Sequence, residues 1–128
     1  MKYLSDYMEE KQTALFNKTG TIFAFSDKQF EEQKVKGKQY SRLSQGMVTE
    51  KGNEIEVIEG LDKIYRDSIK QDMKENGKDK VILRELLNHE AFYVGNIEET
   101  IHKLEDYPIT EDDISQIFQN NWAKYSDY

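Results

Sequence analysis

The sequence contains no cysteine and only one proline, Pro108. Without cysteine the chain has no disulfide framework, no thiolate zinc site and no cysteine nucleophile. No apolar run approaches the roughly 18 residues that a membrane-spanning helix requires. The first residues, Met-Lys-Tyr-Leu-Ser-Asp-Tyr, are followed by acidic residues rather than by the apolar stretch of a secretory signal. We therefore expect a soluble cytoplasmic protein that does not associate with a membrane.

Composition predicts a folded chain with a highly charged surface. The 128 residues are 37% hydrophobic and 34% charged, and 18 basic against 25 acidic side chains give a net charge of −7. Aromatic residues make up 12%, which is too many for a disordered acidic tail. A chain of this length suits one ordinary domain. We expect residues 1–128 to form a single compact domain.

Apolar spacing and capping residues predict a mainly α fold. We expect a compact bundle of about six helices with a minor β-hairpin or extended element near residues 21–50. The run Thr21–Phe25 is short enough for either a strand or a helical turn. The expected helices are a first one that ends at Gly20, then 26–35, 54–76, 80–94, 96–105 and one that begins at Thr110.

Two carboxylates fall where these helices should be apolar. On a helix over 80–94, Glu90 projects at about 80° from Ile82, inside the arc of the apolar side chains, with His89 at its edge. On the preceding helix, Asp72 projects near the centre of the apolar stripe. The two carboxylates are not expected to meet. A buried carboxylate must find a partner, or its pKa rises until it is protonated.

Two interpretations of these carboxylates remain open. In the first, Glu90 and Asp72 belong to a buried network with tyrosine hydroxyls or with an arginine such as Arg84 or Arg42. In the second they belong to a functional pocket in which Glu90 is a general base, or in which His89 and Glu90 bind a ligand. The candidate catalytic residues are His89, Glu90, Asp72 and Arg84.

The sequence carries no recognised cofactor or metal motif. Neighbours such as His89 and Glu90 point about 100° apart on a helix and do not easily chelate one ion. The only other histidine, His102, does not complete the i, i+4 zinc pattern. Phosphate-binding, dinucleotide-binding and nucleophile-elbow motifs are absent. We expect no metal and no cofactor, and binding is favoured over enzymatic activity.

Negative charge is concentrated in the second half of the chain. Residues 65–128 contain 14 acidic and 8 basic side chains. These carboxylates either belong to solvated helix starts or form an acidic surface that binds a basic groove of a protein, as a nucleic-acid mimic would. The candidate binding residues are Glu98, Glu99, Glu111 and Asp112, together with the aromatic residues Trp122, Tyr125 and Tyr128.

Direct nucleic-acid binding is not expected from such an acidic surface, because phosphates would be repelled. A basic strip over Lys34–Lys51, which includes Tyr40, offers an alternative contact for nucleic acid. Its dispersed charges also suit an ordinary solvated loop, and this plainer interpretation is favoured.

Four segments carry a resemblance that spans most of the chain. They are Lys28-Gln29-Phe30, Asp72 followed by Glu75-Asn76-Gly77, Arg84-Glu85-Leu86-Leu87-Asn88-His89-Glu90, and Tyr107-Pro108-Ile109-Thr110 with a following acidic turn. Together they resemble a group of small proteins of bacteriophages, prophages and other mobile elements that has no established activity. The resemblance implies expression in a bacterial cytoplasm and an accessory role.

We therefore expect an accessory protein that binds a host or phage protein and inhibits or modulates a host or defence enzyme. One alternative is a small metal-dependent or general-base hydrolase centred on His89 and Glu90. Another is a structural component of a virion.

Overall fold

A computed structural model describes residues 1–126 of the chain. Over these residues the fold is mainly helical, with seven helices and one three-stranded antiparallel sheet, rather than about six helices. None of the described helices is both long and apolar enough to cross a membrane. The elements are α1 (Leu4–Thr19), β1 (Ile22–Phe23), α2 (Asp27–Gln33), β2 (Tyr40–Ser44), β3 (Met47–Glu50), α3 (Glu54–Asn76), α4 (Lys78–Asn88), α5 (Ala91–Val94), α6 (Glu98–Lys103) and α7 (Glu111–Tyr125).

The chain divides into two units, Met1–Ser68 and Ile69–Tyr128, and helix α3 runs through the boundary. Each unit has buried apolar side chains of its own, such as Val57 in the first and Leu86 in the second. The single compact domain expected from chain length therefore stays a prediction, and the units are described separately below.

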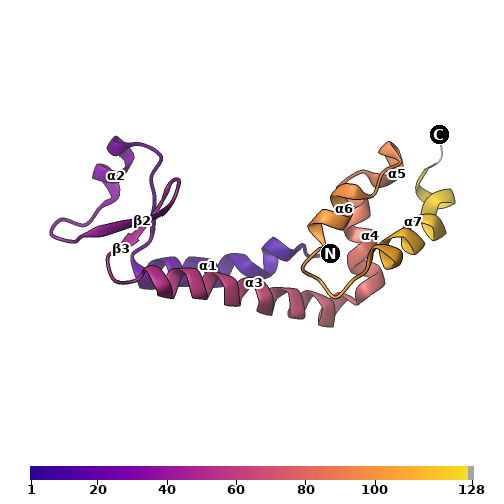
Figure 1. Ribbon diagram of the computed structural model, residues 1–128, viewed down its shortest axis with the longest axis horizontal. Helices are drawn as coiled ribbons and strands as arrows, with labels where there is room; N and C mark the ends of the chain where they lie inside the picture. Colours follow the sequence, from indigo (N-terminus) through magenta and orange to yellow (C-terminus); the bar gives the residue numbers. More distant parts are fainter. Residues whose placement is uncertain (127–128) are drawn as a thin grey trace. The chain divides into compact units, whose positions relative to one another are not determined.

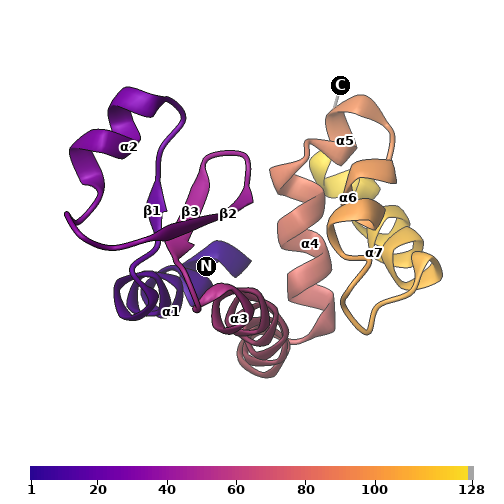
Figure 2. The same cartoon turned by 60° about the vertical axis from the view of Figure 1, so that its left-hand side comes forward.

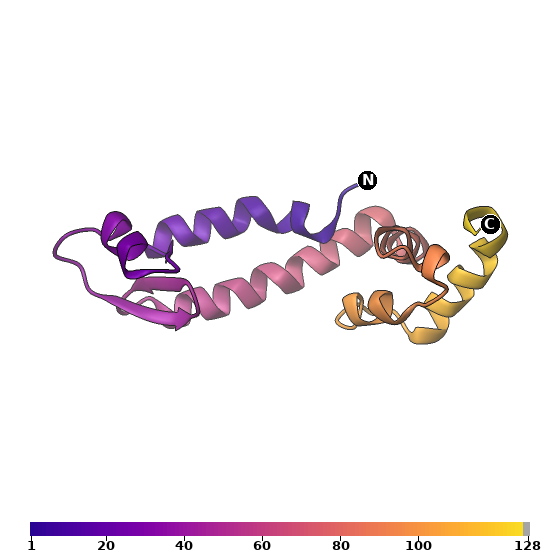
Figure 3. The same ribbon diagram turned by 90° about the horizontal axis from the view of Figure 1, so that it is seen from above.

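In the first unit, α1 and the first part of α3 lie side by side and antiparallel (Figures 1 and 3). At one end, the Asn53 side-chain amide donates to the backbone carbonyl of Thr19 over 2.9 Å. Near the other end, the Ser68 hydroxyl donates to the backbone carbonyl of Tyr7 over 3.4 Å. Helix α1 ends as expected at Gly20, whose φ of 69° is the left-handed conformation that closes a helix.

The sheet lies at one end of this helix pair (Figure 2). Its strand order is β1-β3-β2, with all pairs antiparallel. The expected hairpin is confirmed, and the ambiguous run after Gly20 forms strand β1 rather than a helical turn. The buried Thr49 hydroxyl donates to the carbonyl of Thr19 over 3.0 Å, which ties β3 to the end of α1. Ser26 caps α2 by accepting a hydrogen bond from the backbone N–H of Gln29.

In the second unit, α4 packs against α5, α6 and α7. Its core contains the fully buried Ile82, Leu86, Leu104 and Ile114. Helix α7 begins as expected: the Thr110 hydroxyl accepts from the backbone N–H of Asp113, and the Asp113 carboxylate accepts from that of Thr110.

The prediction of one helix over 80–94 is wrong. Helix α4 ends at Asn88, and a separate helix, α5, begins at Ala91. Between the two helices Glu90 adopts a left-handed conformation with a φ of 55°. This break has a physical reason. The break leaves Glu90 exposed while the next two residues, Ala91 and Phe92, are buried, and it brings Phe92 onto Phe118 in the core of the unit.

Candidate functional site

Asp72 and Arg84 form the centre of a fully buried polar network in the second unit. The two terminal guanidinium nitrogens of Arg84 donate to the two carboxylate oxygens of Asp72 over 2.8 and 2.9 Å. The Tyr107 hydroxyl donates to the same carboxylate over 2.5 Å, and the Asn76 side-chain amide donates over 2.8 Å. The side chain of Asp72 is 0% exposed and that of Arg84 3%. An arginine and a tyrosine hydroxyl are thus among the partners of Asp72, as the first of the two interpretations has it.

These contacts shift the pKa values of all three groups. Burial alone would raise the pKa of Asp72, but hydrogen bonds from Arg84, Tyr107 and Asn76 outweigh it and lower the pKa. Burial opposes the charged form of Arg84 too, yet its carboxylate partners hold its pKa above the ordinary value. Burial and the hydrogen bond to Asp72 both raise the pKa of Tyr107. At neutral pH the network therefore holds a charged pair and a neutral phenol.

A second buried carboxylate, Glu85, extends the network. Its Oε2 accepts from the Nε of Arg84 over 2.6 Å. Its Oε1 has no hydrogen-bond partner and lies 3.7 Å from the Nε2 of His89, which is also without a partner. The Nδ1 of His89 lies 3.4 Å from a carboxylate oxygen of Glu99. The imidazole of His89 thus lies between a buried and an exposed carboxylate.

Glu85 was not predicted, because the buried face of α4 coincides only partly with the arc of apolar side chains, which also includes Leu83 and Leu87. The face that is buried passes through Val81, Ile82, Glu85 and Leu86, whereas Leu87 on the expected inner face is 44% exposed. Three neighbouring helices cover α4 from several sides, so one apolar stripe did not identify the buried face. The adjacent charges of Arg84 and Glu85 were the one available signal, since such a pair can be buried when it is mutually satisfied.

The other candidate residues are not drawn into this network. Glu90 is exposed and lies outside both α4 and α5, so it does not share a site with Asp72. His89 reaches the network only through Glu85. Among residues 1–126 no cluster of histidine, aspartate and glutamate is arranged to hold a metal ion.

A hollow of about 400 Å³ lies beside His89 and is lined by His89, Glu98, Glu99, His102 and Lys103. Glu98 and Glu99 are exposed in the first turn of α6, and Glu111 and Asp112 are exposed in the first turn of α7. Carboxylates at these positions stabilise the positive end of a helix dipole. The four acidic candidates are therefore accessible to a partner and also contribute to their own helices.

Aromatic side chains gather around α5. A second hollow has a volume of about 260 Å³ and is lined by Leu87, Glu90, Phe92, Tyr93 and Tyr125. We call it the α5 hollow. Tyr93 is 72% exposed, while Phe92 is buried and stacks on Phe118 with 5.1 Å between ring centres. Trp122 packs edge to face on Phe118, with 5.3 Å between ring centres, and is 44% exposed. Tyr128, the last aromatic candidate, lies outside the described residues.

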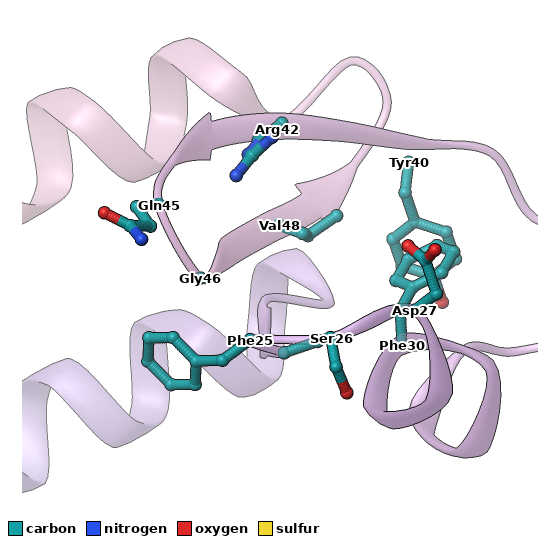
Figure 4. Close-up of a pocket in the computed structure, with 10 residues that line it drawn as sticks. Phe25, Ser26, Asp27, Phe30, Tyr40, Arg42, Gln45, Gly46 and Val48 are labelled. Atoms are coloured by element: carbon teal, nitrogen blue, oxygen red, sulfur yellow. The ribbon is translucent and has the colours of Figure 1, made fainter.

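The first unit has a hollow of its own, of about 350 Å³, between the start of α2 and the β2–β3 hairpin (Figure 4). Phe25, Phe30 and Tyr40 contribute aromatic rings to it, and Arg42 and Asp27 contribute charges. Tyr40 and the basic strip are recognisable in the sequence, but their proximity to Phe25 and Asp27 is not. That proximity depends on the pairing of strands that are distant in sequence.

Comparison with known proteins gives one significant result. No curated protein and no solved structure matches the chain. The model of a protein family whose description states that its function is unknown matches residues 4–127. The match covers almost the entire sequence, including both units and the buried network. The chain therefore belongs to the family of unknown function DUF7659.

Proposed function

We propose that this protein works by binding another protein through its second unit, at the α5 hollow. The observation that carries this proposal is the group of accessible aromatic and aliphatic side chains around one short helix. Tyr93 is 72% exposed and the adjacent Val94 59%. Leu87 and Trp122 are each 44% exposed.

The local packing presents these side chains on an ordered support. Phe92 anchors α5 by stacking on Phe118 and by contact with the Tyr125 ring. Tyr93, the next residue, points away from the same helix into solvent. Single exposed apolar residues are common on protein surfaces, whereas exposed apolar residues that line one hollow, as Leu87 and Tyr93 do, support an interaction site. Tyrosine and tryptophan are enriched at the centres of protein interfaces.

Charge indicates the chemistry of the partner. Residues 69–128 contain 13 acidic and 7 basic side chains, and Glu90 lies within the α5 hollow itself. An acidic surface accelerates association with a basic partner and disfavours acidic ones. The proposed partner is therefore a protein surface that combines apolar side chains with lysine or arginine.

The resemblance to phage and mobile-element proteins extends this proposal. It supports a bacterial cytoplasmic setting and a host or phage protein as the partner. Binding would then inhibit or modulate a host or defence enzyme. The alternative of a structural virion component makes a different prediction, because the protein would then be present in mature particles.

One observation favours a second candidate function, general-base chemistry at His89. The buried Glu85 oxygen faces the Nε2 of His89, and His89 lines the hollow beside α6. A carboxylate that is hydrogen-bonded to an imidazole fixes its tautomer and orientation, and this candidate requires the 3.7 Å between Glu85 and His89 to shorten to hydrogen-bond distance. This candidate replaces Glu90, which is exposed, with Glu85 as the supporting residue. It predicts that His89→Gln abolishes a hydrolytic activity while the fold is retained.

The test of the binding proposal is affinity capture of the full chain from a bacterial lysate. The capture is run with and without nuclease, at low and high salt, and the captured proteins are identified by mass spectrometry. Binding of the purified candidate is then measured for the parent chain, for Tyr93→Ser and for Ile55→Ser. Ile55 is a matched control because it is also an exposed apolar residue, at 69%, but lies on α3 in the first unit.

We expect one stoichiometric partner that is insensitive to nuclease and weakened by salt. Tyr93→Ser should weaken its binding at least ten-fold, the usual effect of losing a central interface aromatic residue, while Ile55→Ser should leave it unchanged. Equal effects of the two substitutions, or capture that depends on nucleic acid, would contradict the proposal.

A further inference from the structure

We propose that the hollow in the first unit is a nucleotide-binding pocket, which takes one nucleotide either free or as part of a single strand. We call it the α2–hairpin pocket, defined by Phe25, Asp27, Phe30, Tyr40 and Arg42 together with the adjoining hairpin residues. Its volume of about 350 Å³ is at the lower end of the range for small-molecule sites. The proposal concerns the first unit and does not depend on the protein-binding function of the second.

The pocket has a rigid, exposed aromatic ring at one end. Phe25 is 73% exposed, yet its backbone N–H donates to the side chain of Gln29 over 2.7 Å. Its ring lies directly against the hairpin turn, because a Cβ on Gly46 would lie 2.3 Å from the ring. The neighbouring Ala24 donates to the carbonyl of Gly46 over 2.8 Å. An aromatic ring that is held in place and open to solvent is suited to stacking on a planar ligand.

A second pair of rings lies at the other end of the pocket (Figure 4). Phe30 and Tyr40 pack edge to face with 5.4 Å between ring centres. The Tyr40 hydroxyl accepts a hydrogen bond from the backbone N–H of Val35 over 2.9 Å, which fixes the ring. Strand β2 places Tyr40 and Arg42 on the same face, because side chains alternate along a strand. The pocket thus has aromatic walls on both sides of a guanidinium.

Two unpaired opposite charges also line the pocket. Arg42 makes no ion pair with any described residue, and neither does Asp27. Two nearby lysines, in contrast, are paired: Lys34 with Glu31 and Lys38 with Glu50. A guanidinium is suited to a phosphate, and a carboxylate accepts hydrogen bonds from the exocyclic amino group of a base. A nucleotide supplies the planar ring, the amino donor and the phosphate in one molecule.

The surrounding charge favours an anionic ligand. Residues 21–53 contain six basic and four acidic side chains, although the whole chain has a net charge of −7. Lys28, Lys36 and Lys51 are exposed and make no ion pair with a described residue. An acidic peptide would pair with Arg42, but its charged side chains would not supply the planar ring on which the exposed Phe25 can stack. Double-stranded DNA hides the faces of its bases, so the pocket favours an unpaired nucleotide.

The test measures binding of the full chain to a fluorescein-labelled single strand of about 12 nucleotides, by fluorescence anisotropy at low and physiological salt. The matched duplex is measured beside it. Unlabelled AMP, CMP, GMP and UMP serve as competitors, and inorganic phosphate controls for an effect of charge alone. The variants are Arg42→Gln and Phe25→Leu. Lys36→Gln is the matched control, because it removes one exposed positive charge from outside the pocket.

We expect the strand to bind more tightly than the duplex, with Arg42→Gln and Phe25→Leu each weakening binding about ten-fold. Lys36→Gln should change binding by about two-fold or less. Phe25→Trp retains a stacking face and should restore binding, and circular dichroism checks that each variant is folded. Competition by mononucleotides identifies the pocket as a site for free nucleotides, and binding of the strand alone identifies it as a strand site.

Three results would overturn the proposal. The first is that neither the strand nor any mononucleotide binds, even at low salt. The second is that Lys36→Gln weakens binding as much as Arg42→Gln, which would indicate a diffuse electrostatic contact. The third is that Phe25→Trp binds no better than Phe25→Leu.

Discussion

Asp72 accepts two parallel hydrogen bonds from the guanidinium of Arg84, over 2.8 and 2.9 Å, where neither side chain is accessible to water. This pair joins the end of α3 to α4 across the short turn at Gly77. The Tyr107 hydroxyl joins the segment that follows α6 to the same carboxylate. Three parts of the second unit therefore depend on one buried carboxylate.

Arg84→Met should strongly destabilise the second unit. It removes the cation from two buried carboxylates, Asp72 and Glu85, and leaving a buried charge uncompensated costs about 3–5 kcal/mol. The free energy of unfolding in urea measures this loss. The matched control is Arg66→Met, which breaks an ion pair with Asp62 in which both side chains are more than 60% exposed. That loss should be below about 1 kcal/mol, and equal losses for the two variants would refute a special role for the buried pair.

Tyr107→Phe should lower the free energy of unfolding at neutral pH. It should also make that free energy fall less steeply as the pH rises above neutral. Losing a hydrogen bond to a charged group costs about 1.5–3 kcal/mol. The pKa of Tyr107 is raised in the folded protein. The protonated phenol therefore makes its full contribution to the free energy of unfolding at pH values below the unfolded pKa of about 10. This contribution falls as the pH rises further and is lost above the folded pKa.

The measurement is urea unfolding at several pH values from neutral to about 11. The parent chain should lose more stability above about pH 10 than Tyr107→Phe does. Tyr125→Phe serves as a control for loss of a hydroxyl elsewhere in the same unit. Parallel pH profiles for the parent and Tyr107→Phe would show that the phenol does not contribute in this way.

Glu90→Gly should stabilise the protein by about 1 kcal/mol, because Glu90 has a φ of 55° that glycine adopts without strain. Glu90→Gln should change the free energy of unfolding by less than about 0.5 kcal/mol, since the side chain is exposed. Thermal and urea unfolding of both variants provide the comparison. A large loss for Glu90→Gln would instead favour the original expectation of a buried, partnered carboxylate.

Several helix starts and ends could be predicted because their causes are local. The caps at Ser26 and Thr110 and the left-handed Gly20 depend on residues within four positions. Asp72 was identified from its helix alone, because a carboxylate inside an apolar stripe requires a partner. These features follow from backbone hydrogen bonds and helical spacing, and neither requires knowledge of the tertiary fold.

The remaining features depend on contacts between elements. The buried face of α4 is set by the helices around it, so the spacing of Leu83 and Leu87 was misleading and Glu85 was overlooked. The break before α5 depends on burial of Phe92 against Phe118. The approach of Phe25 to Gly46 depends on sheet pairing across about twenty residues. Single-segment patterns do not contain this information.

The single domain expected from chain length predicts one cooperative unfolding transition. Trp122 fluorescence reports on the second unit, and far-ultraviolet circular dichroism reports on helices of both. In one domain the two signals should have the same midpoint in urea. Arg84→Met should then shift both midpoints together. Separate midpoints, or a shift confined to the fluorescence, would show that the units unfold independently.

The continuity of α3 has a consequence for dividing the protein into fragments. A cut between Ser68 and Ile69 would fall inside a 23-residue helix and would leave four backbone carbonyls on one side and four amides on the other without helical partners. The N-terminal piece would have to extend to Asn76, and the C-terminal piece would have to begin at Glu54. Both fragments would then carry the same helix, so they would overlap in sequence and could not be joined to regenerate the chain.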